Sequence, residues 1–550
     1  MSKSPKFIFV CGGVLSGVGK GIATASLGYL LKEQGYKVTA VKIDPYLNID
    51  AGLMRPAEHG EVYVTEDGGE IDQDLGNYER FLQYSFSKKN NITSGKVYER
   101  IISKERQMSY GGRDVEIFPD MINEIKLMIR ENIKDEDFVL VEIGGTTGDV
   151  ENLPFLHAAR EIGKESEAVY IMVTYLPFLR SVGELKTKPT QHAVSNLRAV
   201  GIVPDFIITR NEIPIDEPRK ESIAKRCFID IENIIDNPDL ESIYDIPLRF
   251  KHEKFDQKIL KLFGLKVKKH NDDKLEKFVK ALKSSKKQIK VGIVGKYITH
   301  GSGAHMDTYI SVLEAIKHAA GELGAKPIIT MIPSESFEKN KKSLNMLKDF
   351  DCIIVPQGWG SRGSEGKIKT IEFVRNNKIP YLGLCYGMQM AAIEFARNVL
   401  GHKDANSEEV NPKSKNHVIH IMPNQKEYLE KNQYGGTIRL GGWDCVVKEG
   451  SLVFNAYKKH SAFKNIKKSL ITERHRHRYE FNNVYRDEFE KNGMHISGTS
   501  VDGELVEFIE LDRKIHPFFV GTQAHPEYKS YLLKAHPLFL ELLKAGLKVG

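Results

Sequence analysis

A cysteine, a histidine and a glutamate in the second half of the chain have the clearest capacity for chemistry. Cys385 stands on a glycine-flanked turn between a short apolar run and an amphipathic run, and this strand–turn–helix pattern is typical of a nucleophile elbow. The positive end of a helix dipole favours the thiolate that such a nucleophile needs. His525 and Glu527 are two residues apart, so in an extended segment they face the same side and the carboxylate can orient the imidazole. With backbone N–H donors from the glycine turn at 358–360, they predict a Cys-His-Glu site, although a core cysteine and a surface histidine are the alternative for each residue taken singly.

A second candidate site is the glycine-rich segment 12–21, GGVLSGVGKG, near the N-terminus. It follows the apolar run 7–11 and precedes an amphipathic run, which is the strand–loop–helix context of a phosphate-binding loop. Backbone N–H groups, the helix dipole and the Lys20 ammonium would together cradle a triphosphate. The segment departs from the P-loop pattern, because Val14 replaces a glycine and Gly21 replaces the Ser or Thr that holds Mg²⁺. A tight turn with a stray lysine is the alternative interpretation.

Acidic residues that could replace the missing metal ligand follow in two places. The segment 58–76 is dense in acids and glycines, and Glu142 lies near the end of the apolar run 138–143. Acids beside a triphosphate cradle usually need a cation between them, and a lone glutamate in a buried strand is costly unless it is paired or metal-bound. We therefore expect Mg²⁺ here, with a surface loop as the alternative for 58–76.

Two basic stretches suggest binding of anions. The segment 186–191, KTKPTQ, combines two lysines, two hydroxyls and an amide, which suit phosphates and a base edge, although basic loops are common. The segment 473–480, ERHRHRYE, places His475 and His477 in alternation. Because three arginines flank these histidines, we favour a basic strand that holds a carboxylate or phosphate over a metal site.

Length and composition limit the class of protein. A chain of 550 residues is too long for one core, so two or more domains are expected. No stretch approaches twenty apolar residues and no signal-peptide pattern precedes the first strand, so we expect neither a membrane span nor secretion. Five scattered cysteines without a CxxC pair indicate a reducing cytosol rather than a disulfide scaffold or zinc site. The net charge of +7 is mild, and its lysine-rich part at 266–290 favours a solvated linker over nucleic-acid binding.

The order of the expected elements predicts the fold class. Apolar runs alternate with helical stretches in both halves, which indicates βαβα units and mostly parallel sheets. We expect an α/β protein with two doubly wound domains, 1–270 and 290–550, joined by a lysine-rich linker at 271–289. Further strands are expected at about 37–43, 138–143, 168–174, 205–209, 288–295, 326–331 and 352–355, and a helix at about 305–320.

These motifs together resemble two known families. The C-terminal half resembles class I glutamine amidotransferases in the 358–360 turn, in GLCYGMQ at 383–389 and in His-Pro-Glu at 525–527. The N-terminal half resembles the amidoligase domain of the CTP synthase family in the segments 12–21, 42–46, 59–62, 141–145 and 186–191. The likeness covers almost the whole chain, and both halves occur in this order.

The resemblance implies a glutamine-hydrolysing carbon–nitrogen ligase of pyrimidine nucleotide biosynthesis. ATP would phosphorylate O4 of UTP, and ammonia would displace that phosphate to give CTP. The ammonia would come from L-glutamine at Cys385 and travel inside the protein. Mg²⁺ would accompany ATP, GTP would activate glutamine hydrolysis, and CTP would inhibit the enzyme. The family implies a cytoplasmic homotetramer with filaments as a further assembly, and no nucleic-acid or membrane partner.

The resemblance also assigns residues by motif position. The ATP set is Gly17, Val18, Gly19, Lys20, Gly21, Ile22, Lys42, Asp74 and Leu240. The UTP and CTP set is Ser16, Asp149, Val150, Glu151, Lys186, Thr187, Lys188, Pro189, Thr190, Gln191 and Ser222. The glutamine set is Gly358, Tyr386, Gly387, Met388, Gln389, Glu409 and Arg478, the metal pair is Asp74 and Glu142, and the catalytic set is Cys385, His525 and Glu527.

Two positions depart from the family pattern. Gln357 replaces the first glycine of the turn that usually reads PGGFG, while Gly358 is kept, so we expect the oxyanion site to survive. Ser222 stands where the family usually has a nucleotide-contacting lysine, with Lys220 and Lys225 nearby.

Three other classes are alternatives. Another ATP-dependent amidoligase with a fused glutaminase, such as a corrinoid amidase, would not need the segment 186–191. A partitioning-type ATPase would share an unusual glycine loop but would have no use for a Cys-His-Glu half. A scaffold that only forms filaments would not need Lys20, Glu142, Cys385 and His525.

Overall fold

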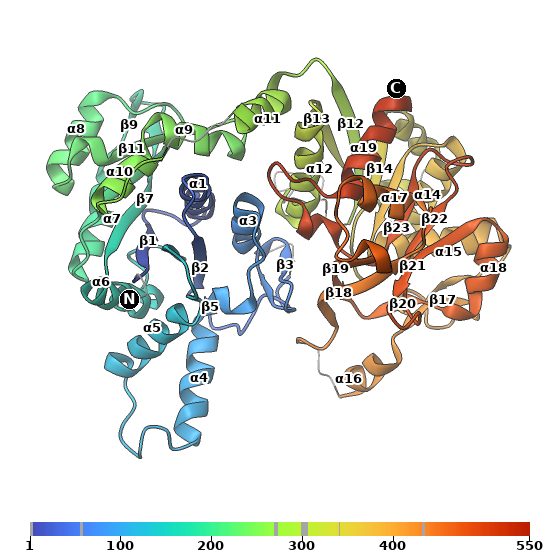
Figure 1. Ribbon diagram of the computed structural model, residues 1–550, viewed down its shortest axis with the longest axis horizontal. Helices are drawn as coiled ribbons and strands as arrows, with labels where there is room; N and C mark the ends of the chain where they lie inside the picture. The colour runs from blue at the N-terminus through green and yellow to red at the C-terminus, as the bar shows by residue number, and fades with distance from the viewer. Residues whose placement is uncertain are drawn as a thin grey trace. The chain divides into compact units, whose positions relative to one another are not determined.

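The chain folds into two compact units. The computed structural model describes residues 4–55, 59–268, 273–296, 298, 306–339, 341–431 and 435–549 (Figure 1). The first unit comprises the chain up to Ala51 together with Asp74–Val279, and the second comprises Gly52–Gln73 together with the chain from Lys280 onward. The second unit therefore includes a short segment from the N-terminal half, which two contiguous domains would not contain.

The first unit is built on a seven-stranded parallel sheet with the strand order β11-β10-β7-β1-β6-β2-β5. Its strands are β1 (Lys6–Gly12), β2 (Val38–Asp44), β5 (Asn91–Thr93), β6 (Phe138–Ile143), β7 (Ala168–Leu176), β10 (Phe206–Asn211) and β11 (Ile234–Pro238), beside the small pair β8 (Phe178–Leu179) and β9 (Glu184–Leu185). Its helices are α1 (Lys20–Glu33), α3 (Gln73–Leu82), α4 (Ser94–Arg106), α5 (Ile122–Arg130), α6 (Leu153–Glu165), α7 (Lys188–Ala199), α8 (Glu217–Cys227), α9 (Ile246–His252) and α10 (Phe255–Leu262).

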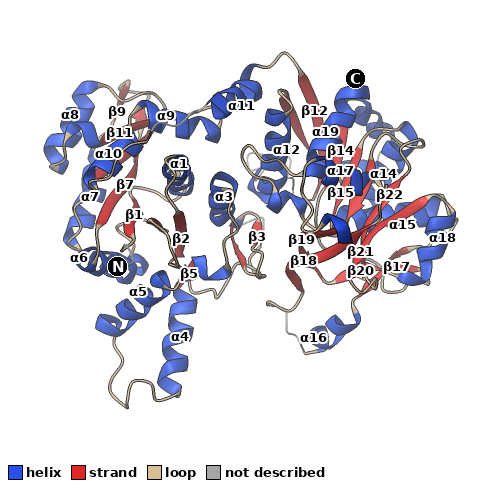
Figure 2. Cartoon of the chain, in the orientation of Figure 1, coloured by secondary structure: helices blue, strands red, loops and turns tan. Residues whose placement is uncertain are grey.

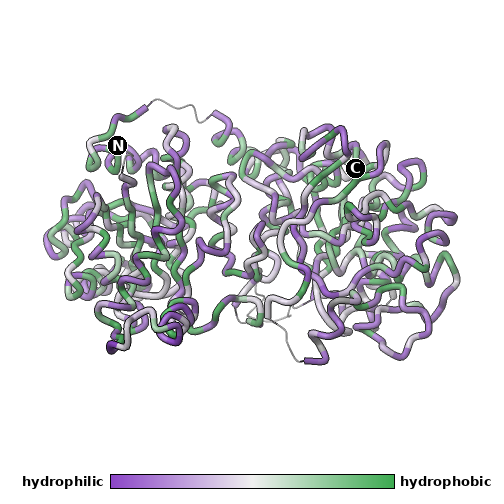
Figure 3. Tube along the Cα trace, turned by 60° about the horizontal axis from the view of Figure 1, so that its bottom comes forward, coloured by the Kyte–Doolittle hydropathy of each residue, from purple (hydrophilic) through white to green (hydrophobic). Residues whose placement is uncertain are grey.

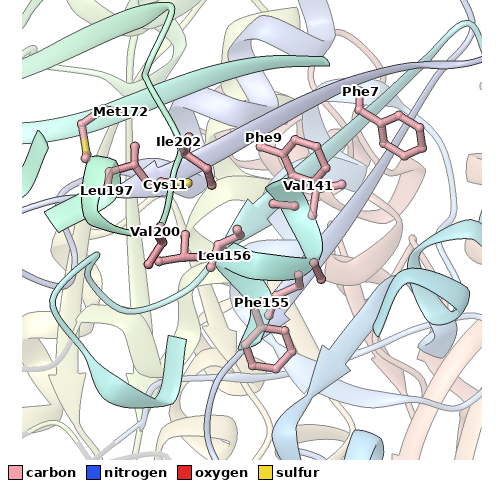
Figure 4. Packing of buried hydrophobic residues seen from close by; sticks show 14 of the residues in the cluster. Phe7, Phe9, Cys11, Val141, Phe155, Leu156, Met172, Leu197, Val200 and Ile202 are labelled. Atoms are coloured by element: carbon pink, nitrogen blue, oxygen red, sulfur yellow. The ribbon is translucent and has the colours of Figure 1, made fainter. Parts of the chain in front are cut away.

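Helices cover both faces of this sheet, as Figure 2 shows. Alternate residues of β1, Phe7 and Phe9, join a buried cluster with Leu156 of α6 and Leu197 of α7 (Figure 4). Helix α1 contacts β1, β2 and β6 outside that cluster, and it packs beside α9 and α10. Because both faces are buried, β1, β6 and β7 carry long apolar stretches, which is why they could be predicted from the sequence. The strands β5 and β11 were not among the sequence-based expectations.

The second unit contains a nine-stranded sheet with the order β13-β12-β14-β15-β23-β22-β21-β18-β19. The first five strands are parallel, and the rest are antiparallel. The strands are β12 (Gln288–Gly295), β13 (Lys326–Pro333), β14 (Cys352–Val355), β15 (Tyr381–Leu384), β18 (Arg439–Val447), β19 (Leu470–His477), β21 (Met494–Ser500), β22 (Val506–Leu511) and β23 (Phe519–Thr522), with a small sheet of β16 (Asn406–Ser407), β17 (His417–Ile421) and β20 (Tyr479–Phe481). The helices are α12 (Ile310–Glu322), α13 (Ser336–Lys339), α14 (Ser364–Asn377), α15 (Tyr386–Asn398), α16 (Lys426–Glu430), α17 (Leu452–Lys459), α18 (Arg486–Lys491) and α19 (Pro537–Val549).

The parallel strands confirm the predicted α/β class in both units. The antiparallel strands β18, β19, β21 and β22 were not among the sequence-based expectations. Hydrophobic stretches, green in Figure 3, run through the interior of each unit. Among the described residues, no helix is long and apolar enough to cross a membrane.

The lysine-rich stretch expected as a linker contains a helix, α11 (Asp273–Ser284). Its apolar residues Leu275, Phe278 and Leu282 recur at helical spacing and are buried. Phe278 packs edge-on against Tyr244, with ring centroids 5.4 Å apart. The lysines therefore form the outer face of an amphipathic helix, and residues 269–272 lie outside the described part of the chain.

Residues 60–72 form a hairpin of β3 (Val62–Val64) and β4 (Glu70–Asp72) within the second unit. Arg474 of β19 is fully buried and pairs with Glu66 at 3.0 Å, and it also donates to the carbonyl oxygen of Val64. Arg476 pairs with Glu70 at 2.8 Å. The basic strand thus holds carboxylates, as predicted, and they belong to the chain itself.

This pairing corrects part of the magnesium expectation for the acidic segment. Glu66 and Glu70 already neutralise buried or half-buried arginines, and Asp72 lies 3.1 Å from His59. The carboxylates of Glu66 and Glu70 balance arginines of the second unit, so they are not available for the expected metal site. Asp74, on α3, is the acid that reaches the glycine loop.

Candidate functional sites

The glycine loop of the first unit joins the end of β1 to the start of α1. Val14 has a φ of +79°, a left-handed conformation that favours glycine. Position 14 therefore has a backbone conformation that suits the glycine of the P-loop pattern, although the residue there is valine. Gly17 and Gly19 also have positive φ values. The Lys20 ammonium donates to the carbonyl oxygen of Gly145 at 2.8 Å, across the sheet edge.

Lys42 lies at the centre of a buried carboxylate cluster. On neighbouring parallel strands it is in register with Glu142, so the two side chains point to one face. Its Nζ lies 3.0 Å from Glu142 and 3.6 Å from Asp44, and it hydrogen-bonds Asp74. Tyr78 donates its hydroxyl to Glu142. Burial opposes the charge of Lys42, but the carboxylates of Asp74, Glu142 and Asp44 raise its pKa well above the usual value.

The same geometry explains why glycine occupies position 21. A Cβ on Gly21 would lie 2.5 Å from Oδ1 of Asp74, so any side chain there would force the Asp74 carboxylate to move. Asp74 therefore fills the space that a Ser or Thr side chain would need at that position. Three carboxylates already converge on one cation, the Lys42 ammonium, and oxygen donors of this kind fit Mg²⁺. In the described part of the chain, no group of three or more His, Cys, Asp or Glu residues has the arrangement of a metal site.

The expected pyrimidine segments meet the glycine loop at the start of α7. A Cβ on Gly13 would lie 2.6 Å from the Cβ of Ala193, so this helix packs directly on the loop. Thr147 donates its N–H to Gly12 at 2.9 Å and its hydroxyl to the Ala193 carbonyl oxygen at 3.1 Å. Thr190, in the segment 186–191, hydrogen-bonds Thr174 of β7 at 3.0 Å. Residues of the segments 12–21, 145–151 and 186–191 thus lie at the same edge of the sheet.

Two further expected residues, Ser222 and Leu240, lie near this edge of the sheet. Lys186 and Arg219 both contact Glu184, and Arg219 belongs to α8, the helix that carries Ser222. Leu240 follows Asp239, which pairs with Arg210 at 2.6 Å. The Arg210 guanidinium lies 3.1 Å from where a Cβ on Gly19 would be.

Cys385 lies between β15 and α15 in a strained conformation, with φ +50° and ψ −100°. Such strain is the mark of a sharp nucleophile turn. A Cβ on Gly387 would lie 1.9 Å from the Val355 carbonyl oxygen, so only glycine permits the helix to start here. The Cys385 N–H donates to Thr522 at 2.7 Å, which places the end of β15 beside the end of β23.

The histidine and glutamate follow β23 and form a buried pair. Nδ1 of His525 lies 2.7 Å from Oε1 of Glu527, and both side chains are buried. Burial disfavours the imidazolium, but the charges of Glu527 and Cys385 raise the pKa of His525 to about 10. Residues 526–529 form a 3-10 turn rather than the expected extended segment. Gln523 donates its amide to Sγ of Cys385 at 3.5 Å.

Two buried lysines hold the glycine turn that precedes α14. Lys367 donates to the carbonyl oxygens of Pro356 at 2.7 Å and of Gln357 at 3.3 Å. Lys296 donates to the Trp359 carbonyl oxygen at 2.8 Å and lies 4.2 Å above the Tyr386 ring. Burial lowers the pKa of Lys367 well below its usual value and that of Lys296 to about 8.

Side chains expected to bind glutamine fix the same turn. Tyr386 donates its hydroxyl to the Gly360 carbonyl oxygen at 2.7 Å, and Glu409 accepts the Gly360 N–H at 2.8 Å. Burial raises the pKa of Glu409. With the carbonyl groups turned toward the lysines, Gly358 faces the cavity at Cys385.

This cavity is small, about 40 Å³. It is lined by Glu61, Val62, Thr308, Tyr309, Gln357, Gly358, Trp359, Cys385, Arg476, His525 and Tyr528. The volume is enough for a water-sized molecule, and two of the lining residues come from the hairpin.

The remaining expected glutamine residues lie outside that lining. Met388 packs in the hydrophobic core, and Gln389 donates to Tyr479 and Gln523. Arg478 donates to Gln425 and Thr437. Their assignment to glutamine stays a prediction.

The paired histidines of β19 surround an arginine, not a metal site. Arg439 lies 3.4 Å from His475 and 3.3 Å from His477, and it pairs with Glu507 at 2.7 Å. Burial and the charge of Arg439 lower the pKa of both histidines well below the usual value. The neutral imidazoles and the Glu507 carboxylate thus surround the buried Arg439 guanidinium.

Sequence reasoning missed several residues of the Cys385 site. Lys296 and Lys367 had no motif, although Lys296 directly follows β12 at the carboxyl edge where ligands bind. Gln523 lies two residues before His525, a spacing that could have drawn attention to it. Glu61 lies in the acidic stretch, and nothing in the sequence near it indicates its partners Ser311 and Gln357.

Known proteins match both halves of the chain. A family model described as CTP synthase N-terminus matches residues 6–265, and one described as Glutamine amidotransferase class-I matches 304–545. The chain is 49% identical to CTP synthase of Carboxydothermus hydrogenoformans, with 99% of each chain covered. It is 47% identical to that of Sulfolobus acidocaldarius over 98% of this chain and 99% of the relative, and 46% identical to that of Methanocaldococcus jannaschii over 99% of each.

The matched domains and the two α/β units define a ligase that hydrolyses glutamine. A nucleotide-binding synthetase half precedes an amidotransferase half with a cysteine on its nucleophile turn. The identity over nearly the full length places the chain in the CTP synthase family.

Proposed function

We propose that this protein converts UTP to CTP, using ATP and ammonia released from L-glutamine. Family membership over nearly the full chain supports the amination of UTP with glutamine as nitrogen source. The observation that carries the proposal is the presence of two separate reactive clusters, Lys20–Lys42–Asp74–Glu142 in one unit and Cys385–His525–Glu527 in the other. One cluster suits phosphoryl transfer and the other suits amide hydrolysis.

At the cysteine site, the Cys385 thiolate attacks the side-chain amide of glutamine. The Gly358 turn stabilises the oxyanion, and the His525 imidazolium gives its proton to the leaving nitrogen. The C–N bond breaks, ammonia leaves and a glutamyl thioester remains. Water then hydrolyses the thioester to glutamate, with His525 oriented throughout by Glu527.

At the synthetase site, O4 of UTP attacks the γ-phosphorus of ATP and ADP leaves. Ammonia adds to C4 of the pyrimidine, and phosphate departs to give CTP. Residues 17–22, Lys20 and Lys42 would bind the ATP phosphates, with Leu240 beside them. Ser16, Asp149–Glu151, Lys186–Gln191 and α8 near Ser222 would bind UTP and CTP.

Mg²⁺ is the cofactor that the donor set fits. Asp74 and Glu142 would hold it together with phosphate oxygens, and Lys42 would then turn from these carboxylates to the phosphates. Held there, the ion would supply positive charge against the phosphate oxygens. Gly21 leaves room for Asp74 in this role.

Regulation and assembly follow from the family alone. We propose GTP as activator of glutamine hydrolysis, CTP as feedback inhibitor, a homotetramer with filaments as a further assembly, and a cytoplasmic location. The five described cysteines are free and buried, which agrees with a reducing compartment.

The test is the absorbance change on conversion of UTP to CTP with ATP, Mg²⁺ and either glutamine or ammonium chloride. We expect CTP from both nitrogen sources and glutamate from glutamine. Glutamine hydrolysis without CTP from either source would point instead to another amidoligase and would contradict the proposal.

A further inference from the structure

The cavity at Cys385 is closed on one side by the hairpin 60–72. The hydroxyl of Tyr63 donates to the Tyr528 carbonyl oxygen, and the hydroxyl of Tyr528 donates to the Val62 carbonyl oxygen, each at 3.0 Å. Val62, Tyr63 and Tyr528 are at most 4% exposed. Ammonia formed at the thiol therefore arises beneath this hairpin.

Glu61 is the acidic residue of the hairpin that reaches the cavity. It is 4% exposed, so its carboxylate must be satisfied within the protein. One oxygen accepts the N–H of Ser311 at 3.0 Å and the Ser311 hydroxyl. The other accepts the side-chain amide of Gln357 at 3.1 Å. Three donors from two segments thus fix one buried carboxylate.

Gln357 links this carboxylate to the turn that would stabilise the oxyanion. Its backbone carbonyl accepts from Lys367 at 3.3 Å and from Tyr309 at 3.4 Å, and the next residue, Gly358, lines the cavity. A glycine at position 357 could make the backbone contacts but could not reach Glu61. The side chain of Gln357 therefore adds a direct bond between the hairpin and the turn.

We propose that the Gln357–Glu61 hydrogen bond is a latch that keeps the hairpin closed over the Cys385 cavity and so retains the ammonia formed there. Gln357 acts as a positioning residue, since its side-chain amide bonds Glu61 and its backbone holds the turn. The inference rests on the proposed function, because retention matters only where ammonia is used in a second reaction.

The latch predicts a specific defect, which is loss of coupling between the two reactions. Gln357→Glu places a second carboxylate against Glu61, and Gln357→Met keeps the length of the side chain but removes the donor. We expect either change to raise the open fraction of the hairpin about tenfold, as loss of a hydrogen bond to a charged group implies. CTP formed per glutamate released should fall at least about twofold by escape of free ammonia, while glutamine hydrolysis continues.

A double variant that exchanges the two side chains should restore the hydrogen bond between positions 61 and 357, with donor and acceptor exchanged. In Glu61→Gln/Gln357→Glu, the new amide donates to the new carboxylate, and its carbonyl oxygen still accepts from Ser311. We expect its ratio of CTP to glutamate to return to that of the unmodified chain. Asn377→Asp, an amide-to-acid change at the exposed C-terminal end of α14, serves as the matched control and should leave the ratio unchanged.

The experiment measures CTP, glutamate and free ammonium in the full-length chain, with ammonium chloride as a parallel nitrogen source. The latch is supported if only the single variants lose coupling and all variants use ammonium equally well. It is overturned if Gln357→Met couples like the unmodified chain, or if the double variant stays uncoupled. Failure of the unmodified chain to make CTP from ammonium would instead overturn the proposed function.

Discussion

Replacement of Glu527 by glutamine tests whether the charge of Glu527 keeps His525 protonated at the Cys385 site. Oε1 of Glu527 lies 2.7 Å from Nδ1 of His525, and both groups are buried. Glutamine keeps the size of the side chain and removes its charge. We expect glutamine hydrolysis to fall sharply while CTP formation from ammonium persists.

The size of the effect follows from the pKa of His525. Burial acts to lower this pKa, yet the charges of Glu527 and Cys385 raise it from 6.5 to about 10. That change corresponds to about 5 kcal/mol in favour of the imidazolium. Glu527 is the larger of the two raising charges, so its loss should slow hydrolysis by about 10²- to 10³-fold, less than the full 5 kcal/mol allows.

The pH profile of glutamine hydrolysis shows in which direction the pKa of His525 changes. His525 is protonated below its pKa of about 10, so in the unmodified chain the proton for the leaving nitrogen is lost only as pH rises toward 10. Without the charge of Glu527, burial is opposed by Cys385 alone and the pKa of His525 falls. The alkaline limb of glutamine hydrolysis should therefore move to lower pH in Glu527→Gln.

The assay compares glutamate release between pH 6 and about 10 in Glu527→Gln and in Glu473→Gln. Glu473 forms a second buried pair, 3.1 Å from His536, which does not line the Cys385 cavity. Its variant controls for the loss of any buried carboxylate. Hydrolysis by Glu527→Gln within about threefold of the unmodified chain, with an unmoved alkaline limb, would refute the charge argument.

Other predictions concern the synthetase site. Asp74→Asn and Glu142→Gln should each abolish CTP formation from both nitrogen sources and leave glutamate release intact; normal synthesis in both would remove them as magnesium ligands. Gly21→Ala should collide with Asp74 and reduce synthesis at least about tenfold, measured as kcat for ATP. Lys186→Ala should raise KM for UTP far more than it affects glutamate release. Ser222→Lys should change the affinity for UTP or CTP and leave that for ATP nearly unchanged, as isothermal titration of each nucleotide would show.

The parallel strands and the reactive turns were predictable because each leaves a local signal. Buried parallel strands such as β1 and β6 carry the apolar stretches FIFVC and FVLV, and the glycines around Cys385 mark a turn that no other residue type permits. The exception at Val14 shows that backbone shape can persist after the pattern residue is lost.

The parts that could not be predicted depend on contacts between distant segments. Nothing near Glu66 or Glu70 in the sequence indicates arginines more than 400 positions away, so these acids resembled metal ligands. The roles of the buried residues Lys296 and Lys367 also leave no signal in the sequence, since their partners are backbone carbonyl oxygens of a turn. The antiparallel strands β18, β19 and β22 place charged residues among the apolar ones, so they show no apolar stretch as long as that of β1.

The most direct test of two separate reaction sites is CTP formation by Cys385→Ala with glutamine and with ammonium chloride. The thiol serves only to release ammonia, whereas phosphorylation and amination depend on Lys20, Lys42 and Glu142. We predict that glutamine-dependent synthesis is lost, and that ammonia-dependent synthesis at a pH that supplies free NH₃ stays close to that of the unmodified chain. Loss of both activities in a folded protein would contradict the account.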